Sequence, residues 1–368
     1  MACENEYDED VKNLRKLFYN KKIVSFKIRH IQCMAGSSSG DNYMSVVKRV
    51  QISDGLSTNN QNDLNKFSVI IKRQIPSLSR RQLYRCDEAF TNEINAYTNV
   101  VPLLEEYTSG PLFPKCYYAG QDDVGEIIML EDLKNLGYRL QNRLTGLDVQ
   151  HCKLVMKELA KLHAASIAAK QLDKERFSEK SKHIQEIVYC KEAEEFYRNI
   201  MESSVQESIN SLHTSNIDGS LTEPIRRIEQ LQSKIFTTIQ HSILNAKENL
   251  RVMCHGDLWV NNIMFKTATN SNASMNNFVP CAVKFFDLQA MRYTSPVFDI
   301  LHFVYTSTKR QLRDMHTQTL LQTYHDALMT HLEQQFSKDA THLVSFKQIY
   351  SLCNITAEYY KHVLYGLA

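Results

Sequence analysis

The residues best suited to chemistry lie at 254–265, a segment that reads Cys-His-Gly-Asp-Leu-Trp-Val-Asn-Asn-Ile-Met-Phe. Asp257 and Asn262 stand five positions apart, in a predicted turn between a helix and a strand. Such a turn can present a carboxylate and a carboxamide to one ligand at the base of a cleft. The alternative interpretation is a capped turn whose aspartate has only a structural role.

A second acid, Asp287, ends the predicted strand over 281–288. If this strand pairs with the predicted strand over 260–265 through the polar 267–277 loop, Asp287 lies beside Asn262. Oxygen ligands of this kind suit Mg²⁺, which binds few protein groups and keeps phosphate oxygens among its other ligands. Asp257 then remains free to orient a hydroxyl group.

The N-terminal half supplies a cation and a partner for it. Lys72 ends the run Val-Ile-Ile-Lys in a predicted strand over 67–75. Glu93 lies on the semi-apolar stripe of a predicted helix over 79–100, and buried carboxylates require a partner. We therefore expect Lys72 to pair with Glu93 and to face nucleotide phosphates. The alternative is a solvated lysine at a strand end.

A loop of small residues joins the first two predicted strands, over 22–32 and 43–52. Because it does not open a helix and lacks the Gly-Lys-Ser/Thr sequence, it is neither a Rossmann turn nor a Walker loop. A flap over phosphates fits, and a simple exposed hairpin loop is the alternative. The expected nucleotide contacts in it are Gly36, Ser37, Ser38, Ser39, Gly40 and Asn42.

The elements that would position these side chains divide the chain into two parts. A helix over 8–20 and period-two segments up to the strand at 126–133 predict an antiparallel sheet. From about 149 the pattern is mainly helical, beginning with a long helix over 149–172. We expect an α+β protein with a nucleotide-binding lobe at 1–131 and a catalytic and acceptor lobe at 132–368.

Composition excludes several classes of protein. The 368 residues carry 43 basic and 41 acidic side chains, a balance that argues against a nucleic-acid binder. The nine cysteines form no CxxC pair and show no zinc spacing, which favours reduced thiols. With no signal-like start and no apolar run of ~20 residues, we expect a cytoplasmic protein without a membrane span.

In this order the motifs resemble the ecdysteroid kinase-like family, in the choline kinase and aminoglycoside phosphotransferase branch of the two-lobed protein-kinase-like fold. The resemblance runs from about residue 20 to the end of the chain. The segments that carry it are Gly40-Asp-Asn-Tyr43-x-Ser45, Lys72, Phe90-x-x-Glu93-x-x-x-Tyr97, Leu130-Glu-Asp-Leu133, Leu162-His-Ala-Ala-Ser166, His255-Gly-Asp-Leu-Trp-x-Asn-Asn262 and Asp287-Leu-Gln289.

The resemblance implies an ATP- and Mg²⁺-dependent kinase. Asp257 would be the catalytic aspartate, Asn262 and Asp287 would bind metal, and Lys72, held by Glu93, would contact phosphate. A hinge against adenine would be formed by Glu131, Asp132 and Leu133. The first expected acceptor is the hydroxyl of an ecdysteroid, and the second is a plant or xenobiotic alcohol.

Differences from the protein-kinase motifs indicate which class of acceptor substrate to expect. Gly256 replaces their arginine, Leu-Gln follows Asp287, and no activation segment precedes 294–299. These features favour a small-molecule acceptor over a protein or nucleic-acid substrate. An alternative is a catalytically impaired pseudokinase with a regulatory or scaffold role, because relatives typically continue beyond residue 368 through further helices. The oligomeric state is left open.

Four further residues receive structural interpretations. His255 is expected to stabilise its turn and His163 to be a satisfied core histidine, while Trp259 is expected to pack. Asp299 is expected, by resemblance, to brace the catalytic turn, with helix capping as the alternative.

Overall fold

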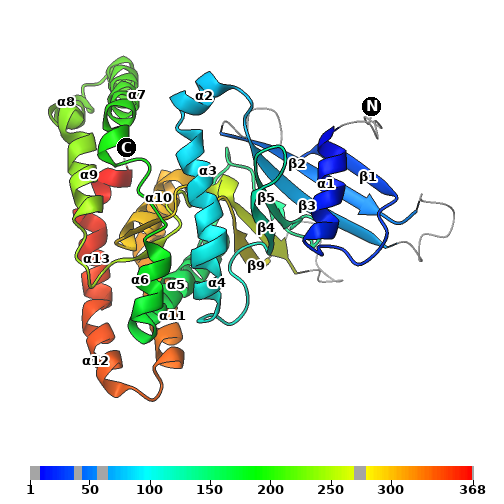
Figure 1. The fold of residues 1–368 in the computed structure, drawn as a ribbon. Helices are drawn as coiled ribbons and strands as arrows, with labels where there is room; N and C mark the ends of the chain where they lie inside the picture. The colour runs from blue at the N-terminus through cyan, green and yellow to red at the C-terminus, as the bar shows by residue number, and fades with distance from the viewer. Residues whose placement is uncertain (1–8, 37–43, 56–64, 269–278, 367–368) are drawn as a thin grey trace.

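The computed structural model describes residues 9–36, 44–55, 65–268 and 279–366. Its N-terminal part is a five-stranded antiparallel sheet in the order β1-β2-β3-β5-β4 (Figure 1). The strand bounds are β1 His30–Ala35, β2 Ser45–Ser53, β3 Lys66–Gln74, β4 Cys116–Gln121 and β5 Glu126–Glu131. Helix α1 (Glu9–Asn20) covers one face of this sheet.

The alternation of side chains along β3 explains which of its residues face the cleft. Val69 and Ile71 pack with Leu14 and Phe18 of α1 in a small core. Ile70 and Lys72 therefore project to the opposite face, because successive side chains of a strand alternate. That face looks toward the rest of the molecule, and both residues line a cleft there.

The first predicted strand was wrong in position, since β1 begins only at His30. Residues 22–29 lie outside the strands, yet Ile28 is buried and Phe26 packs against the same small core. The period-two pattern thus reflects burial of alternate side chains without a regular ladder. Strand β4 was not predicted.

The helix predicted over 79–100 is also interrupted. The structure has α2 (Leu78–Leu83), α3 (Cys86–Asn95), a π-helical turn at Ala96–Val100 and α4 (Val101–Glu105). Arg85 adopts a left-handed conformation with φ of 51°, which ends α2 and redirects the chain. The face predicted from spacing survives, because Phe90, Glu93 and Tyr97 are all buried.

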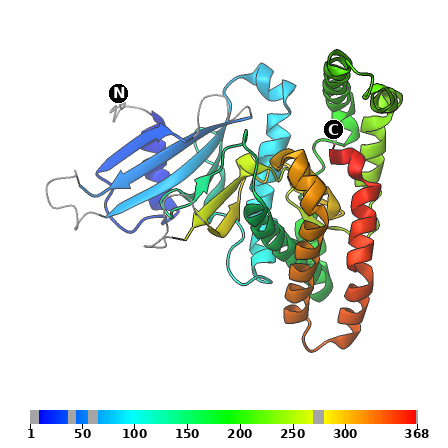
Figure 2. The same cartoon turned by 180° about the vertical axis from the view of Figure 1, so that it is seen from behind.

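The remainder is mainly helical, and the back view shows the helices gathered on one side of the sheet (Figure 2). Helix α5 keeps the predicted bounds, with the side chain of Asp148 capping its first turn. The helix bounds are α5 Val149–Leu172, α6 Lys174–Ser181, α7 Glu194–Ser215, α8 Thr222–Leu231, α9 Ile235–Leu244, α10 Val297–Ser307, α11 Arg310–Gln335, α12 Ala340–Ile349 and α13 Leu352–Lys361.

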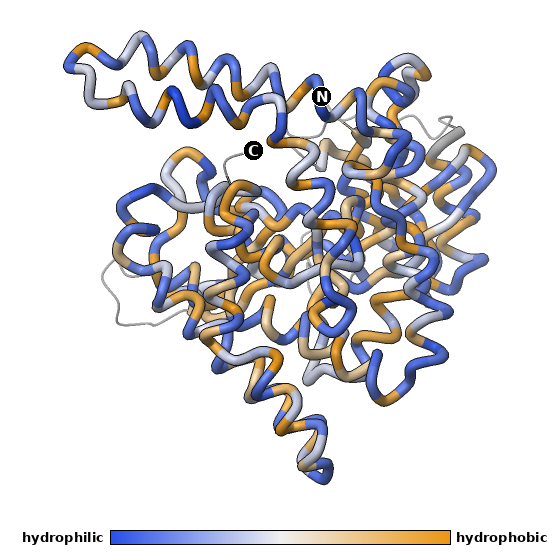
Figure 3. The backbone as a smooth tube through the Cα atoms, turned by 90° about the vertical axis from the view of Figure 1, so that its left-hand side faces the viewer, coloured by the Kyte–Doolittle hydropathy of each residue, from blue (hydrophilic) through white to orange (hydrophobic). Residues whose placement is uncertain are grey.

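Helix α5 and its partner α11 form the centre of the large core. In Figure 3 the central segments carry many apolar positions, whereas the outer helices alternate between hydrophilic and hydrophobic ones. Short helical turns at Lys191–Ala193, Gln232–Lys234, Val260–Asn262 and Val363–Gly366 complete the helical part. None of the described helices is long and apolar enough to cross a membrane.

Two small sheets lie between the large sheet and the helices. β7 (Val252–Cys254) pairs with β10 (Arg292–Thr294), and β8 (Ile263–Thr267) pairs with β9 (Pro280–Phe285) and with β6 (Arg139–Leu140). The predicted hairpin between the 260–265 and 281–288 segments is confirmed, although Val260–Asn262 form a helical turn. The expected α+β class is confirmed, while the lobe boundary near 131–134 stays a prediction.

Candidate active site

The residues expected to carry chemistry meet in one cleft of about 480 Å³, within the range typical of small-ligand sites. This cleft lies between the five-stranded sheet and the small sheet β6-β8-β9, since residues of both sheets line it. Every expected site residue that the structure describes lines it: Gly36, Lys72, Glu93, Glu131, Asp132, Leu133, Asp257, Asn262 and Asp287. The expected contacts Ser37, Ser38, Ser39, Gly40 and Asn42 lie outside the described residues.

Lys72 is held by two carboxylates rather than one. Its Nζ donates to Glu93 Oε2 at 2.5 Å, as expected, and also to Asp287 Oδ1 at 2.7 Å. Burial alone would lower the pKa of Lys72, but Asp287 and Glu93 outweigh it and raise that pKa. The ammonium therefore remains charged at the base of the cleft. The contact with Asp287 was not predicted.

Glu93 stays buried because it has several donors. Burial raises the pKa of its carboxyl group, and the charge of Lys72 opposes that rise. Its second oxygen accepts from the backbone N–H of Leu288 at 3.3 Å, directly after Asp287. Helix α3 thus holds both the lysine and the segment that carries the second acid.

The turn at 254–257, which carries the expected catalytic residue Asp257, is held by Asp299 of α10. Its carboxylate accepts from the backbone N–H of His255 at 2.7 Å and of Gly256 at 2.8 Å. His163 lies 3.2 Å from the same carboxylate, and its other ring nitrogen lies 2.8 Å from the Tyr324 hydroxyl. Burial would raise the pKa of Asp299, but these donors lower it. Asp299 thus braces the turn, and His163 is a satisfied core histidine.

His255 fits the turn-stabilising interpretation. It is fully buried, and its Nε2 lies 3.0 Å from the carbonyl oxygen of Phe286, next to Asp287. Burial lowers the pKa of the imidazole, so the neutral ring is favoured. The backbone N–H of Asp257 donates to its Nδ1 at 3.3 Å. His255 therefore connects the two loops that carry the acids.

Asp257 is fixed on both sides. The carboxamide of Asn262 donates through Nδ2 to Asp257 Oδ2 at 2.9 Å and also to its carbonyl oxygen at 2.9 Å. On the other side, His302 Nε2 lies 3.1 Å from Asp257 Oδ1. Sequence reasoning missed His302. The available signal was its position three residues after Asp299, which places both on one face of α10.

Asn262 and Asp287 have the donor chemistry of a magnesium site. The N–H of Phe286 donates to the carbonyl of Asn262 at 3.1 Å, so the hairpin brings the two residues to one end of the small sheet. Asn262 donates through nitrogen, which leaves its carboxamide oxygen as the group able to bind a cation. Lys72 contacts Oδ1 of Asp287, which leaves Oδ2. Hard oxygen donors of this kind fit Mg²⁺.

One acid of the expected hinge, Asp132, is engaged by the large sheet. The Asp132 carboxylate is buried and accepts from Ser68 Oγ at 2.7 Å and from Arg49 Nη2 at 3.2 Å. Its side chain is thereby committed to the large sheet. Trp259, interpreted as a packing residue, both packs against the large core and lines the cleft.

Comparison with known proteins gives a family. Residues 39–335 match the model of the ecdysteroid kinase-like family. No curated protein matches the chain. Among solved structures, the GDP complex of a wild-type aminoglycoside 2′-phosphotransferase-IIIa is 14% identical, with a TM-score of 0.41 over 99% of this chain and 96% of that one. A microcompartment-associated aminopropanol kinase is 9% identical, with a TM-score of 0.36 over 97% and 94%.

Proposed function

The chain belongs to the ecdysteroid kinase-like family, and on that premise we propose that it transfers the γ-phosphoryl group of ATP to a hydroxyl of a small apolar molecule. The observation that carries the proposal is the convergence of Lys72, Asp257 and Asp287 on one cleft. A buried, charged lysine paired with Glu93 of helix α3 and with Asp287 is a costly arrangement, and phosphoryl transfer uses a lysine and an acid placed in this way.

Each group has a distinct task in this proposal. Lys72 contacts the nucleotide phosphates, and Glu93 and Asp287 keep it oriented. Asn262 and Asp287 would hold Mg²⁺, which neutralises charge on the phosphates when it is bound. Asp257 aligns the acceptor hydroxyl and accepts its proton, so that catalysis rests mainly on positioning and charge.

Two observations support a small acceptor over a protein. Helix α10 begins at Val297, only ten residues after Asp287, and the short strand β10 occupies part of that interval. This interval has no room for a long activation segment. In addition, Trp259 lines the cleft and its backbone N–H donates to the carbonyl oxygen of Asp257 at 3.2 Å, so the cleft has apolar surface beside this aspartate. An ecdysteroid is the first proposed acceptor and a xenobiotic or plant alcohol the second.

The balanced charge of the chain supports a small molecule over a nucleic acid as the partner. The nine cysteines form no CxxC pair in the sequence, and this pattern supports the cytoplasmic location that we propose. A pseudokinase that binds nucleotide without turnover is the alternative function, and the presence of all the expected catalytic residues weighs against it.

The test is ATP turnover by the full chain with Mg²⁺, measured with and without a library of steroid and plant alcohols. We expect ADP formation that depends on one class of alcohol, with a phosphorylated product detected by mass spectrometry. Asp257→Asn is the matched control and should keep nucleotide binding while losing roughly 10²–10⁴ of the turnover. Nucleotide binding without turnover on any alcohol would favour the pseudokinase.

A further inference from the structure

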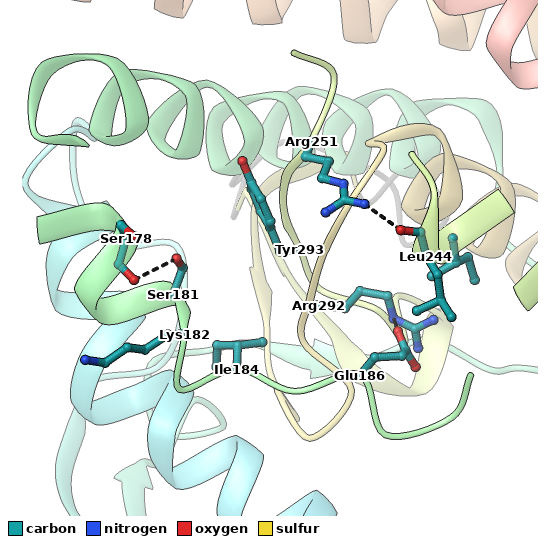
Figure 4. Close-up of a pocket in the computed structure, with 10 residues that line it drawn as sticks. Ser178, Ser181, Lys182, Ile184, Glu186, Leu244, Arg251, Arg292 and Tyr293 are labelled. Atoms are coloured by element: carbon teal, nitrogen blue, oxygen red, sulfur yellow. Dashed lines mark hydrogen bonds and ion pairs between the residues drawn. The ribbon is translucent and has the colours of Figure 1, made fainter. Parts of the chain in front are cut away.

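A second cavity lies on the helical part of the molecule, away from the residues of the cleft. It has a volume of about 340 Å³, near the lower end of the range of small-ligand pockets. The end of α6, the segment after it, the end of α9 and strand β10 form its walls. Figure 4 shows Ser178 and Ser181 on one side, Arg292 and Leu244 on the other, and Tyr293 and Arg251 between them.

The lining is rich in positive charge. Lys182, Arg251 and Arg292 contribute three cations, and Glu186 is the only acid among the described lining residues. Arg251 uses Nε and Nη2 on the backbone carbonyls of Ala246 and Leu244, and its Nη1 lies 3.9 Å from Glu248 at the exposed surface. The hydroxyl of Ser178 adds a neutral donor, whereas Ser181 Oγ donates to the carbonyl oxygen of Ser178 at 3.4 Å.

Arg292 is the unusual member of this set. Its side chain is 4% exposed, and its Nη1 is buried with no hydrogen-bond partner among the described residues. Its contact with Glu186 is 3.4 Å from Nε to Oε2, longer than a charge-assisted hydrogen bond. Glu186 itself is held through Oε1 by the N–H groups of Val188 and Tyr189. A buried guanidinium with an unused donor is uncommon and calls for an explanation.

Apolar and aromatic surface accompanies the charge. Ile184, Ile243 and Leu244 line the cavity beside the ring of Tyr293. The Tyr293 hydroxyl is already engaged, because it donates to Glu248 at 2.6 Å. The ring is thus held in place as a wall. Such a cavity suits a molecule with an anionic head and a flat or aliphatic body.

We propose that this cavity is a second binding site, for a small organic anion whose carboxylate or phosphate faces Arg251 and Arg292 and whose apolar body lies along Tyr293. The head group would also accept from the hydroxyl of Ser178 and would be attracted by Lys182 at the rim. The proposal does not depend on the phosphoryl-transfer reaction, because none of these residues lines the catalytic cleft.

The site is physically connected to the catalytic turn through Arg292. Its Nε donates to the carbonyl of Ala290 at 3.3 Å and its Nη2 to the carbonyl of Gly256 at 3.5 Å. Gly256 precedes Asp257, and Ala290 follows the Asp287 loop. An anion that draws the guanidinium toward the cavity would weaken these contacts. Binding of an anion in this cavity is thereby coupled to the position of the 254–257 turn.

Isothermal titration calorimetry of the full chain with phenyl phosphate, and with phenol as the uncharged match, tests the site. We expect phenyl phosphate to bind and phenol not to bind. Arg251→Gln and Lys182→Gln should each weaken binding by about tenfold, the loss of one charge-assisted contact. Because Lys182 is exposed, its variant should fold whatever Arg251→Gln does. Lys174→Gln, an exposed lysine of α6 outside the cavity, is the control and should change nothing.

Lys72→Met distinguishes this cavity from the cleft. Binding that survives Lys72→Met and is weakened about tenfold in Lys182→Gln supports the proposal. Binding that is lost in Lys72→Met and unchanged in the two cavity variants would place the ligand in the cleft and overturn it, as would no binding at all. Trp259, the only tryptophan, lies two residues after Asp257, so its fluorescence reports on the coupling to the turn.

Discussion

His302 Nε2 lies 3.1 Å from Asp257 Oδ1, which links helix α10 directly to the expected catalytic carboxylate. Asn262 donates to the other oxygen of Asp257, so the carboxylate is held from two sides. The imidazole is partly exposed, with 25% of its side chain accessible. Helix α10 thus serves the site twice, because Asp299 on the same face fixes the backbone of the turn.

We predict that His302→Ala lowers kcat by about tenfold and leaves nucleotide affinity unchanged, because a loosely held Asp257 misplaces the acceptor hydroxyl. His302→Gln should restore much of the rate, since its amide can still donate to Asp257. Steady-state kinetics at saturating acceptor would measure this. His362→Gln is the control, as His362 packs on Phe298 of the same helix and pairs with Glu358 instead. An equal loss in both His302 variants would contradict a positioning role.

Local patterns predicted those parts of the fold that depend on neighbours in sequence. Helix α5 was predicted with its observed bounds because its apolar stripe lies within one continuous segment. The first strand was misplaced because alternate burial at 22–29 occurs without a strand partner. The break at Arg85 was missed because a left-handed residue other than glycine leaves no compositional trace.

The contacts of the candidate site divide in the same way, into those that a local pattern predicts and those that depend on long-range packing. The pairing of Lys72 with Glu93 could be predicted because a carboxylate on an apolar stripe needs a cation nearby. The contact of Lys72 with Asp287 spans 215 positions. It depends on how the large sheet packs on the loop that carries Asp287, and no local sequence pattern reports this packing. His302 was missed although its spacing of three from Asp299 was a local signal, because the apolar pattern of its helix is typical of a core helix.

Lys72 and the two carboxylates that contact it, Glu93 and Asp287, predict an order of stability losses. Lys72→Met leaves two neighbouring carboxylates without their cation, whereas Glu93→Gln still leaves Lys72 paired with Asp287. We expect Lys72→Met to lower the free energy of unfolding by roughly 3–5 kcal/mol and Glu93→Gln by less. The double variant should be less than additive by about 1 kcal/mol or more in urea denaturation. Additive losses would mean that the two residues do not interact in solution.

His255 predicts a pH dependence of stability. Its pKa is lowered from 6.5 by burial, so the folded state binds the imidazole proton less readily than the unfolded chain. The contribution of His255 to stability is therefore complete above about pH 6.5 and is lost as the pH falls through its lower, folded-state pKa. We expect thermal melts between pH 7 and 5 to show a falling Tm, with a shallower slope in His255→Gln. An unchanged slope in that variant would assign the acid sensitivity to other groups.

Gly256 cannot accept a side chain in this turn. Its φ is +85°, and a Cβ built at this position would lie 1.8 Å from the carbonyl oxygen of Ala290. The protein-kinase arginine is thus sterically excluded here, because the segment after Asp287 passes directly over the turn. We predict that Gly256→Ala abolishes turnover and lowers Tm. Gly219→Ala, also at positive φ but with Thr222 Oγ1 no nearer than 4.0 Å to the added Cβ, carries backbone strain alone and should lower Tm less. Full activity of Gly256→Ala would show that the turn rearranges easily.

The last prediction concerns the metal. Asp287 supplies a formal negative charge and Asn262 only a carbonyl dipole, so the acid should contribute more to cation binding. Asp287→Asn should raise the Mg²⁺ concentration needed for nucleotide binding steeply, and Asn262→Ala should raise it more mildly. Asn262→Ala should also lower kcat, because Asp257 loses the carboxamide that fixes its Oδ2.

Nucleotide affinity measured across a Mg²⁺ titration separates these effects from the role of Asp287 as a partner of Lys72. Glu93→Gln is the matched control, since it removes a partner of Lys72 without removing an expected metal ligand. The nucleotide affinity of Glu93→Gln should fall by a similar factor at every Mg²⁺ concentration. The nucleotide affinity of Asp287→Asn should instead approach that of the wild type as the Mg²⁺ concentration rises. If the two variants show the same Mg²⁺ dependence, Asp287 acts only through Lys72 and the magnesium assignment fails.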